Sequence, residues 1–216
     1  MFETIVLAAG GSTRMGAWKL LLPWQGLTVV ETVVEEARAF CDRVIVVAGY
    51  RSTDLEELLG GLDGVEVVTH PGWRKGQFTS LQRGLVEVRS EAFFVTLADM
   101  PGVRRTLFAD LAAARDRDER GRVPRAVRSG SPQHPGHPVL FDAAARDLIL
   151  AMDPGVSMQG VFPQLALTYV VADPSAWGDV DTPSDYTPGI LDPDRTRCPP
   201  RLFAEATNAA RRLASG

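Results

Sequence analysis

The sequence predicts an α/β fold with a mostly parallel central sheet, built as a single domain. Short apolar runs rich in β-branched residues alternate with amphipathic segments, which is the pattern of wound βαβ units. The first run, 5–9, is apolar without alternation and ends at a glycine pair, as expected of a strand buried on both faces. The 216 residues, 45% hydrophobic and 23% charged, suffice for one globular core.

The elements that we expect follow one another through short connections. Periodicity predicts helices over 29–40, 54–59, 79–88, 104–115, 143–151 and 203–213. It predicts strands over 5–9, 43–48, 65–68, 92–97, 123–128, 138–141 and 165–171. The charged stretch 115–122 is expected to be an exposed connection. We interpret 1–186 as the domain proper and 187–216 as a C-terminal tail, with a helix, that belongs to the same unit.

Charge and cysteine content exclude several classes of protein. The formal net charge of −4 argues against nucleic acid or an anionic membrane as the main partner. Cys41 and Cys198 are far apart and form no CxxC pair, so neither a disulfide framework nor a zinc site is indicated. The N-terminus has no basic region before its short apolar run, which is too short for a membrane span. We therefore expect a cytoplasmic protein.

A glycine-rich segment follows the first predicted strand and reads LAAGGSTRMGAWK over 7–19. Glycines at the carboxyl end of a strand allow backbone N–H groups to approach an anion, and Arg14 and Lys19 add positive charge suited to a triphosphate. The spacing fits neither GxxxxGK[ST] nor GxGxxG, so ordinary P-loop kinases and dehydrogenases are excluded. The alternative is that the glycines only make turns and both basic side chains are solvated.

Two further segments carry aspartates. Asp99 stands in LADMP at the end of a predicted strand, and Asp181 alternates with Asp179 in GDVDTP. Magnesium prefers hard oxygen ligands, often one or two carboxylates together with substrate phosphates and water. Two aspartates from distant segments could supply that pair. The alternative is that Asp99 caps the next helix and Asp181 closes an Asx turn.

These segments resemble the signature of the nucleotidyltransferases typified by the molybdenum cofactor cytidylyltransferases and guanylyltransferases, over about residues 3–186. The resemblance implies a Rossmann-like nucleotide-diphospho-sugar transferase fold and magnesium-dependent transfer of a nucleoside monophosphate from an NTP. It implies Arg14, Lys19 and Asp99 as catalytic residues and Asp99 and Asp181 as metal ligands. By the same resemblance the nucleotide is bound by Leu7, Ala8, Ala9, Gly10, Gly11, Arg14 and Lys19.

The base of the nucleotide is expected near the start of a helix. Gly76, Gln77 and Ser80 lie in a segment that offers N–H donors, hydroxyls and an amide. The segment resembles the GQxxSL stretch that contacts the pyrimidine in the cytidylyltransferases. Ala9, where the guanylyltransferases tend to carry glycine, also favours CTP. The alternative is that Thr79 and Ser80 are only N-caps.

The acceptor end of the site is less well marked. His137 lies in GHPVLF, which resembles an element near the acceptor, although a histidine between Gly and Pro is often only a loop residue. The chain departs from the family here, because 131–135 and 153–159 lack the arginines usual there. The resemblance implies molybdopterin as acceptor and a molybdoenzyme as client. Another phosphorylated acceptor, such as a phospholactate-like, sugar-phosphate or polyol-phosphate compound, or a non-catalytic cofactor-binding accessory protein, stays open.

Overall fold

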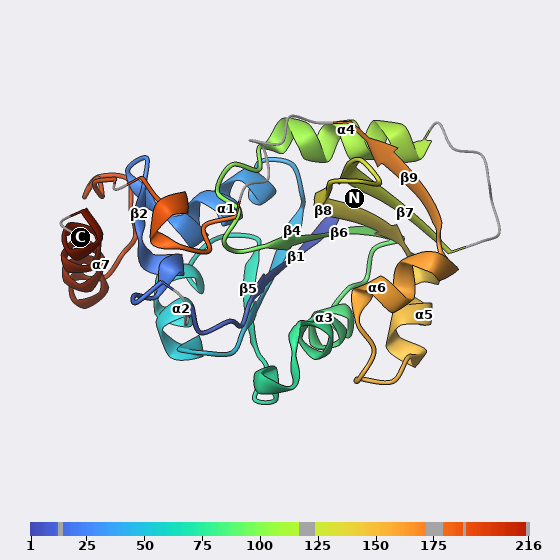
Figure 1. The fold of residues 1–216 in the computed structure, drawn as a ribbon, viewed down its shortest axis with the longest axis horizontal. Coiled ribbons are helices and arrows are strands. Elements are labelled where there is room, and N and C mark those ends of the chain that lie inside the picture. Colours follow the sequence, from blue (N-terminus) through green and yellow to red (C-terminus); the bar gives the residue numbers. More distant parts are fainter. Residues whose placement is uncertain (13–14, 117–123, 172–178, 188, 215–216) are drawn as a thin grey trace.

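A seven-stranded sheet forms the centre of the molecule in the computed structural model, which describes residues 1–12, 15–116, 124–171, 179–187 and 189–214. Its strands are antiparallel only where β8 pairs with β6 and β7, and the other pairs are parallel (Figure 1). The predicted mostly parallel α/β sheet is therefore confirmed. The spatial order is β5 (Val65–Thr69), β4 (Arg43–Ala48), β1 (Glu3–Ala8), β6 (Ala92–Leu97), β8 (Pro135–Asp142), β7 (Arg125–Gly130) and β9 (Ala166–Val170).

Helices cover both faces of this sheet (Figure 1). Side chains of β4 alternate between two cores, with Val44 and Val46 in one and Ile45 and Val47 in the other. Because successive side chains of a strand point to opposite faces, both faces of the central strands are buried. The first core is completed by α1 (Val29–Arg38), α2 (Ser52–Leu59) and α4 (Arg105–Asp116), and the second by α3 (Gln77–Leu85) and α5 (Ala143–Ala151).

Several short elements have no counterpart among the predicted ones, because one turn or two residues are too short to show a period. They are η1 (Lys19–Leu21), the hairpin β2 (Pro23–Trp24) and β3 (Leu27–Thr28), η2 (Trp73–Lys75), α6 (Met158–Val161), η3 (Phe162–Gln164) and η5 (Pro183–Asp185). Longer elements differ at their ends. The helix expected over 79–88 begins at Gln77 and ends at Leu85, and the one expected from 54 begins at Ser52.

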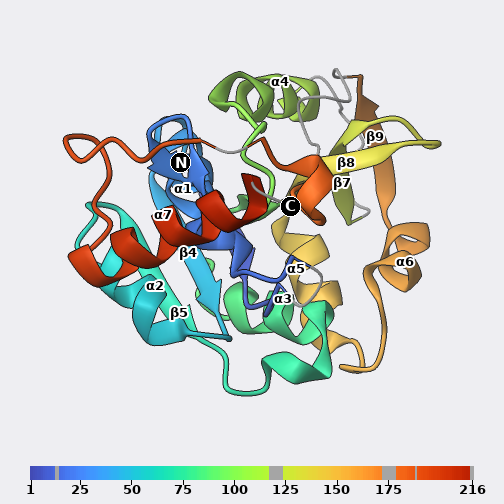
Figure 2. The same cartoon turned by 60° about the vertical axis from the view of Figure 1, so that its left-hand side comes forward.

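The C-terminal helix α7 (Pro200–Ala214) lies against α2 (Figure 2). Arg51, just before α2, donates two hydrogen bonds to the Glu205 carboxylate on α7, at 2.5 and 2.8 Å. Leu202 and Ala206 on the same helix are buried in the first core. The helix predicted over 203–213 is confirmed, and it begins three residues earlier.

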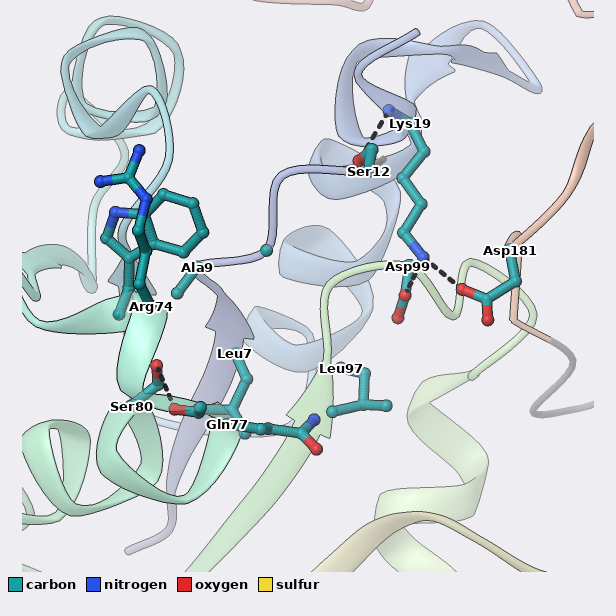
Figure 3. A pocket seen from close by; sticks show the side chains of 13 residues that line it. Leu7, Ala9, Ser12, Lys19, Arg74, Gln77, Ser80, Leu97, Asp99 and Asp181 are labelled. Carbon is teal, nitrogen blue, oxygen red and sulfur yellow. Dashed lines mark hydrogen bonds and ion pairs between the residues drawn. The ribbon is translucent and has the colours of Figure 1, made fainter. Parts of the chain in front are cut away.

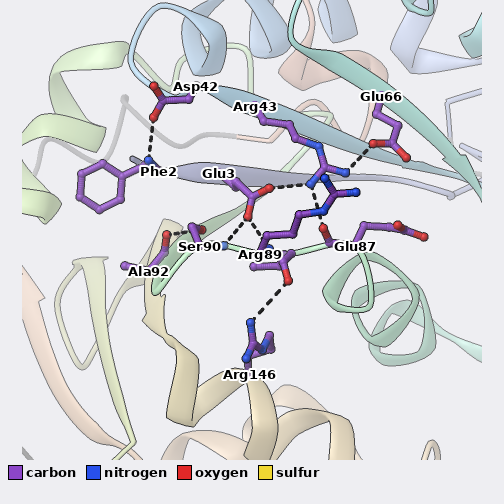
Figure 4. Close-up of polar contacts among 11 residues, drawn as sticks. Phe2, Glu3, Asp42, Arg43, Glu66, Glu87, Arg89, Ser90, Ala92 and Arg146 are labelled. Atoms are coloured by element: carbon purple, nitrogen blue, oxygen red, sulfur yellow. Dashed lines mark hydrogen bonds and ion pairs between the residues drawn. The ribbon is translucent and has the colours of Figure 1, made fainter.

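Polar contacts tie the strands together at the amino ends of β1 and β4 (Figure 4). The Glu3 carboxylate is buried and accepts hydrogen bonds from the backbone N–H groups of Arg89 and Ser90, at 2.6 and 2.7 Å. It also pairs with the Arg43 guanidinium at 2.5 Å. Burial alone would raise the pKa of Glu3, but these donors outweigh it and hold the pKa below its ordinary value.

Within the described ranges no helix is both long and apolar enough to cross a membrane.

Candidate active site

A pocket of about 650 Å³ opens at the carboxyl ends of β1 and β6 (Figure 3). In α/β sheets this edge is where ligands usually bind. The pocket is lined by Leu7, Ala9, Gly10, Ser12, Lys19, Trp73, Arg74, Gly76, Gln77, Ser80, Leu97, Asp99 and Asp181. The structure thus brings four separate predicted segments around one cavity, namely the glycine-rich loop, the α3 start and the segments that carry Asp99 and Asp181.

Lys19 lies between the two aspartates. Its ammonium is 2.5 Å from Asp99 Oδ2 and 2.6 Å from Asp181 Oδ1 (Figure 3). Its backbone N–H donates to the Ser12 hydroxyl at 3.2 Å, which folds the glycine-rich loop back on η1. Burial by itself would lower the pKa of Lys19, but the two carboxylates outweigh it and raise the pKa. Lys19 is therefore positively charged throughout the neutral pH range.

The aspartates reach this lysine from distant parts of the chain. Asp99 lies two residues beyond the end of β6, and its carbonyl accepts the Val180 N–H at 3.0 Å, which holds the 179–181 segment beside it. The alternative of a helix cap at Asp99 is wrong, since α4 begins only at Arg105. Thr182 and Asp185 form the capping box of η5, while the Asp181 carboxylate points to Lys19.

The two carboxylates form a fitting donor set for magnesium. Both are partly exposed toward the pocket, with 18% of the Asp99 side chain and 28% of the Asp181 side chain accessible. Asp179 is a further acidic neighbour, and burial together with the charges of Asp181 and Asp99 raises its pKa. The described residues contain no cluster of three ligand side chains. A pair of carboxylates that leaves positions to phosphate oxygens and water is the arrangement that magnesium commonly uses.

The start of α3 forms the opposite wall of the pocket. Gly76 is the N-cap at a φ of 119°, a conformation that favours glycine, and no side chain caps this helix end. Thr79 instead donates its hydroxyl back to the Gly76 carbonyl at 2.8 Å. The N-cap alternative for Thr79 and Ser80 is therefore wrong. Free N–H groups at a helix start suit either an anion or the acceptor atoms of a base.

Four residues that line the pocket were not predicted as site residues, namely Ser12, Trp73, Arg74 and Leu97. Trp73 packs against Gly49, where an added Cβ would lie 2.5 Å from the indole side chain. The Arg74 guanidinium lies 4.6 Å from the centre of the Trp73 ring. The sequence signal for this pair was the Pro-Gly turn before a helix, which fixes no side-chain direction.

Not every predicted site residue faces the pocket. The Ala8 side chain is buried in the first core, and Gly11 lines a different cavity next to α7. Arg14 lies outside the described residues. The roles expected of these three in binding the nucleotide stay predictions.

His137 lies in a second cavity of about 230 Å³, which shares Leu7 and Gln77 with the first. It is part of strand β8, so the alternative of a loop residue is wrong. Its Nδ1 is 3.3 Å from the carbonyl oxygen of Val95. Burial lowers the pKa of His137 to about 4, which leaves the ring neutral at pH 7.

Fold and pocket together define an α/β protein with a ligand pocket at the carboxyl edge of its sheet, and the lysine and paired aspartates lie at one end of that pocket. Residues 4–167 match the family model described as the MobA-like NTP transferase domain. The chain belongs to this family and is a nucleotidyltransferase. The resemblance stated from the motifs is therefore confirmed.

Individual relatives agree with this assignment. The chain is 29% identical to the molybdenum cofactor cytidylyltransferase of Escherichia coli, over 85% of this chain and 93% of that protein. It is 30% identical to a probable molybdenum cofactor guanylyltransferase of Nostoc sp., over 60% of this chain and 58% of that protein. A solved nucleotidyl transferase of Methanothermobacter superposes with a TM-score of 0.71 and 26% identity, covering 86% of this chain and 94% of that one. The nucleotide-diphospho-sugar transferase fold is thereby confirmed.

Proposed function

We propose that this nucleotidyltransferase transfers CMP from CTP to a phosphorylated, cofactor-like acceptor, most directly molybdopterin, and that it requires magnesium. The observation that carries the proposal is the position of Lys19, which lies between Asp99 and Asp181 in the pocket at the carboxyl ends of β1 and β6. The similarity to the Escherichia coli cytidylyltransferase covers 85% of this chain and 93% of that protein, and it supports CTP and this acceptor. Ala9 in the pocket lining is consistent with CTP.

The reaction needs only positioning and charge neutralisation. An oxygen of the acceptor phosphate attacks the α-phosphorus of the NTP, the bond from the α-phosphorus to the bridging oxygen breaks, and pyrophosphate leaves. The attacking phosphate is already ionised, so no general base is required. Lys19 and Arg14 stabilise the negative charge of the triphosphate and of the departing pyrophosphate.

The aspartate pair would hold the metal. Asp99 and Asp181 fit magnesium, which when bound neutralises charge on the phosphate oxygens. With the metal on these carboxylates, the Lys19 ammonium would contact phosphate oxygens instead. Gln77 and Ser80 face the same pocket from α3 and supply hydrogen-bonding groups for the base.

A different phosphorylated acceptor remains a second candidate. The observation in its favour is that 131–135 and 153–159 carry no arginine. Both candidates use the same nucleotide site and the same chemistry, and they differ only in the acceptor. An acceptor screen by pyrophosphate release, with CTP held constant, separates them.

The proposal is tested by thermal shift with each of the four NTPs, with and without magnesium. A ligand that binds only the folded state raises its apparent stability. We expect the largest shift with CTP and magnesium together, and a much smaller one in Lys19→Ala. Lys75→Ala, an exposed lysine outside the pocket lining, is the control and should keep the full shift. No shift with any NTP in the wild type would favour the accessory-protein alternative instead.

A further inference from the structure

The second cavity adjoins the nucleotide pocket and differs from it in character. Leu7 and Gln77 line both cavities, so a molecule in the second one would lie next to a nucleotide in the first. Aliphatic and aromatic side chains, among them Phe141, Met158 and Phe162, make most of its wall. Such a wall fits the apolar or aromatic body of a small ligand.

One positive charge projects into this apolar cavity. Arg128 on β7 is half-buried, and its Nε donates to the Gly136 carbonyl at 3.0 Å. Its guanidinium lies 4.5 Å from the centre of the Phe162 ring, which holds the planar group in place. The remaining N–H groups are not used by any hydrogen bond among the described residues.

No carboxylate balances this charge within the described part of the chain. The side chains that line the cavity include no aspartate or glutamate, and its histidine, His137, is neutral at pH 7. Burial lowers the pKa of Arg128 more than the neighbouring Tyr169 raises it, which is the direction expected of a guanidinium withdrawn from water without a carboxylate. A half-buried guanidinium without a carboxylate partner is unfavourable, and an oxyanion that it can grip with two N–H groups lowers that cost.

We propose that Arg128 binds an oxyanion of the acceptor, a phosphate or a carboxylate, and thereby selects acceptors that carry an anionic group on an apolar or aromatic body. The proposal rests on the proposed nucleotidyl transfer and specifies its second substrate. The segments 131–135 and 153–159 contain no arginine, and Arg128 on strand β7 supplies a positive charge in their place. The negative charge of the bound group is thereby held beside the nucleotide pocket.

The experiment uses phenyl phosphate as the probe and benzyl alcohol as its neutral counterpart. Both are titrated by NMR into the wild type, Arg128→Lys and Arg128→Gln, each with the nucleotide pocket filled by magnesium and a non-hydrolysable CTP analogue. Arg125→Gln is the matched control, because Arg125 is on the same strand but pairs with Asp142 and does not line the cavity.

We expect the wild type to bind phenyl phosphate and not benzyl alcohol. The dissociation constant should rise at least about tenfold in Arg128→Gln and less in Arg128→Lys, which keeps the charge but loses the fork. Arg125→Gln should bind as the wild type does. Equal affinity in the wild type and Arg128→Gln, or no binding to the wild type, would overturn the proposal.

A second measurement separates this proposal from the function on which it rests. The thermal shift by CTP and magnesium should be the same in all four proteins, which also shows that the variants are folded. If that shift is absent throughout, the nucleotidyl-transfer proposal fails, and titration without nucleotide still reports whether affinity depends on Arg128. With an acceptor in hand, Arg128→Gln should raise the KM for the acceptor and leave the KM for CTP unchanged.

Discussion

The charge of Lys19 has two effects on the aspartate pair: it neutralises the carboxylates when no metal is present, and it opposes the binding of a metal. Alone with Asp99 and Asp181, its ammonium neutralises two carboxylates that would otherwise repel each other in a partly buried site. The same ammonium repels an incoming divalent cation. The lysine is therefore expected to keep the site from binding metal tightly until a nucleotide arrives with its own negative charge.

Replacing Lys19 by methionine should separate metal binding from nucleotide binding. In the absence of nucleotide we expect Lys19→Met to bind magnesium about tenfold more tightly than the wild type, because the competing positive charge is gone. The measurement is the rise in melting temperature with magnesium concentration. Lys75→Met is the matched control, and adding Asp99→Asn to Lys19→Met should abolish the gain. A magnesium response no larger than that of the wild type would contradict the assigned aspartate pair.

Glu3 illustrates a buried charge that stabilises the fold away from the pocket. Glu3→Gln removes the charge that Arg43 and two backbone N–H groups share, and should lower the free energy of unfolding by about 1.5–3 kcal/mol at pH 7. Because the folded-state pKa of Glu3 is lowered, its contribution is present above the unfolded value near 4.5 and lost as pH falls below it. Chemical denaturation at pH 7 and at decreasing pH measures both effects. If the variant and the wild type lose stability equally between pH 5 and 3, Glu3 is not the group responsible.

Candidate site residues could be predicted where their position in the sequence fixes their position in the fold. The glycine-rich loop and Asp99 each follow a buried parallel strand, and the ends of parallel strands meet at one edge of a sheet. Trp73 and Arg128 gave no such signal. The position of Trp73 is set by its packing against Gly49. The position of Arg128 is set by β7, a strand whose two faces are both partly buried. Both depend on tertiary contacts that no local pattern encodes.

At the scale of elements, periodicity located the long helices and the strands but not their ends. α3 begins at Gln77 because the preceding Gly76 has a positive φ of 119°, which a period of 3.6 does not report. The antiparallel direction of β8 was also not foreseen, because the sequence pattern of a buried strand is the same in either direction.

The η2 turn offers a test of how an element shapes the pocket. In Gly49→Ala the new methyl group would lie 2.5 Å from the Trp73 side chain and 2.9 Å from the Ala9 side chain, so η2 and the loop after β1 must move apart. We expect CTP binding with magnesium to weaken about five- to tenfold while the fold persists, since a shift of this wall misplaces Trp73 and Arg74. Isothermal titration measures the affinity. Gly61→Ala, where an added Cβ meets nothing within 4 Å, is the control. Unchanged affinity in Gly49→Ala would show that the η2 wall does not contribute to nucleotide binding.

At the scale of the whole molecule, we propose that the C-terminal residues from 187 onward belong to the same cooperative unit as the rest. Ala209 on α7 packs with Met15 and Tyr186, so this helix closes a small core behind the glycine-rich loop. Arg51 contacts Glu205 on α7 and also stacks over the Trp18 ring at 4.5 Å. The sequence predicted the helix but not its partners, because its docking depends on long-range ion pairs and small apolar side chains.

The unfolding of Leu202→Ala tests whether α7 and the rest of the molecule unfold as one cooperative unit. Leu202 is fully buried in the same core as the central strands, so truncating it should cost about 2–4 kcal/mol and leave a cavity. If α7 is part of one unit, the single denaturation transition shifts as a whole, with secondary and tertiary structure lost together. Asn208→Ala, on the exposed side of α7, should change stability by less than about 0.5 kcal/mol. A separate early transition that removes only a small part of the helical signal would instead show that α7 unfolds independently of the domain. The glycine-rich loop would then not depend on α7 for its stability.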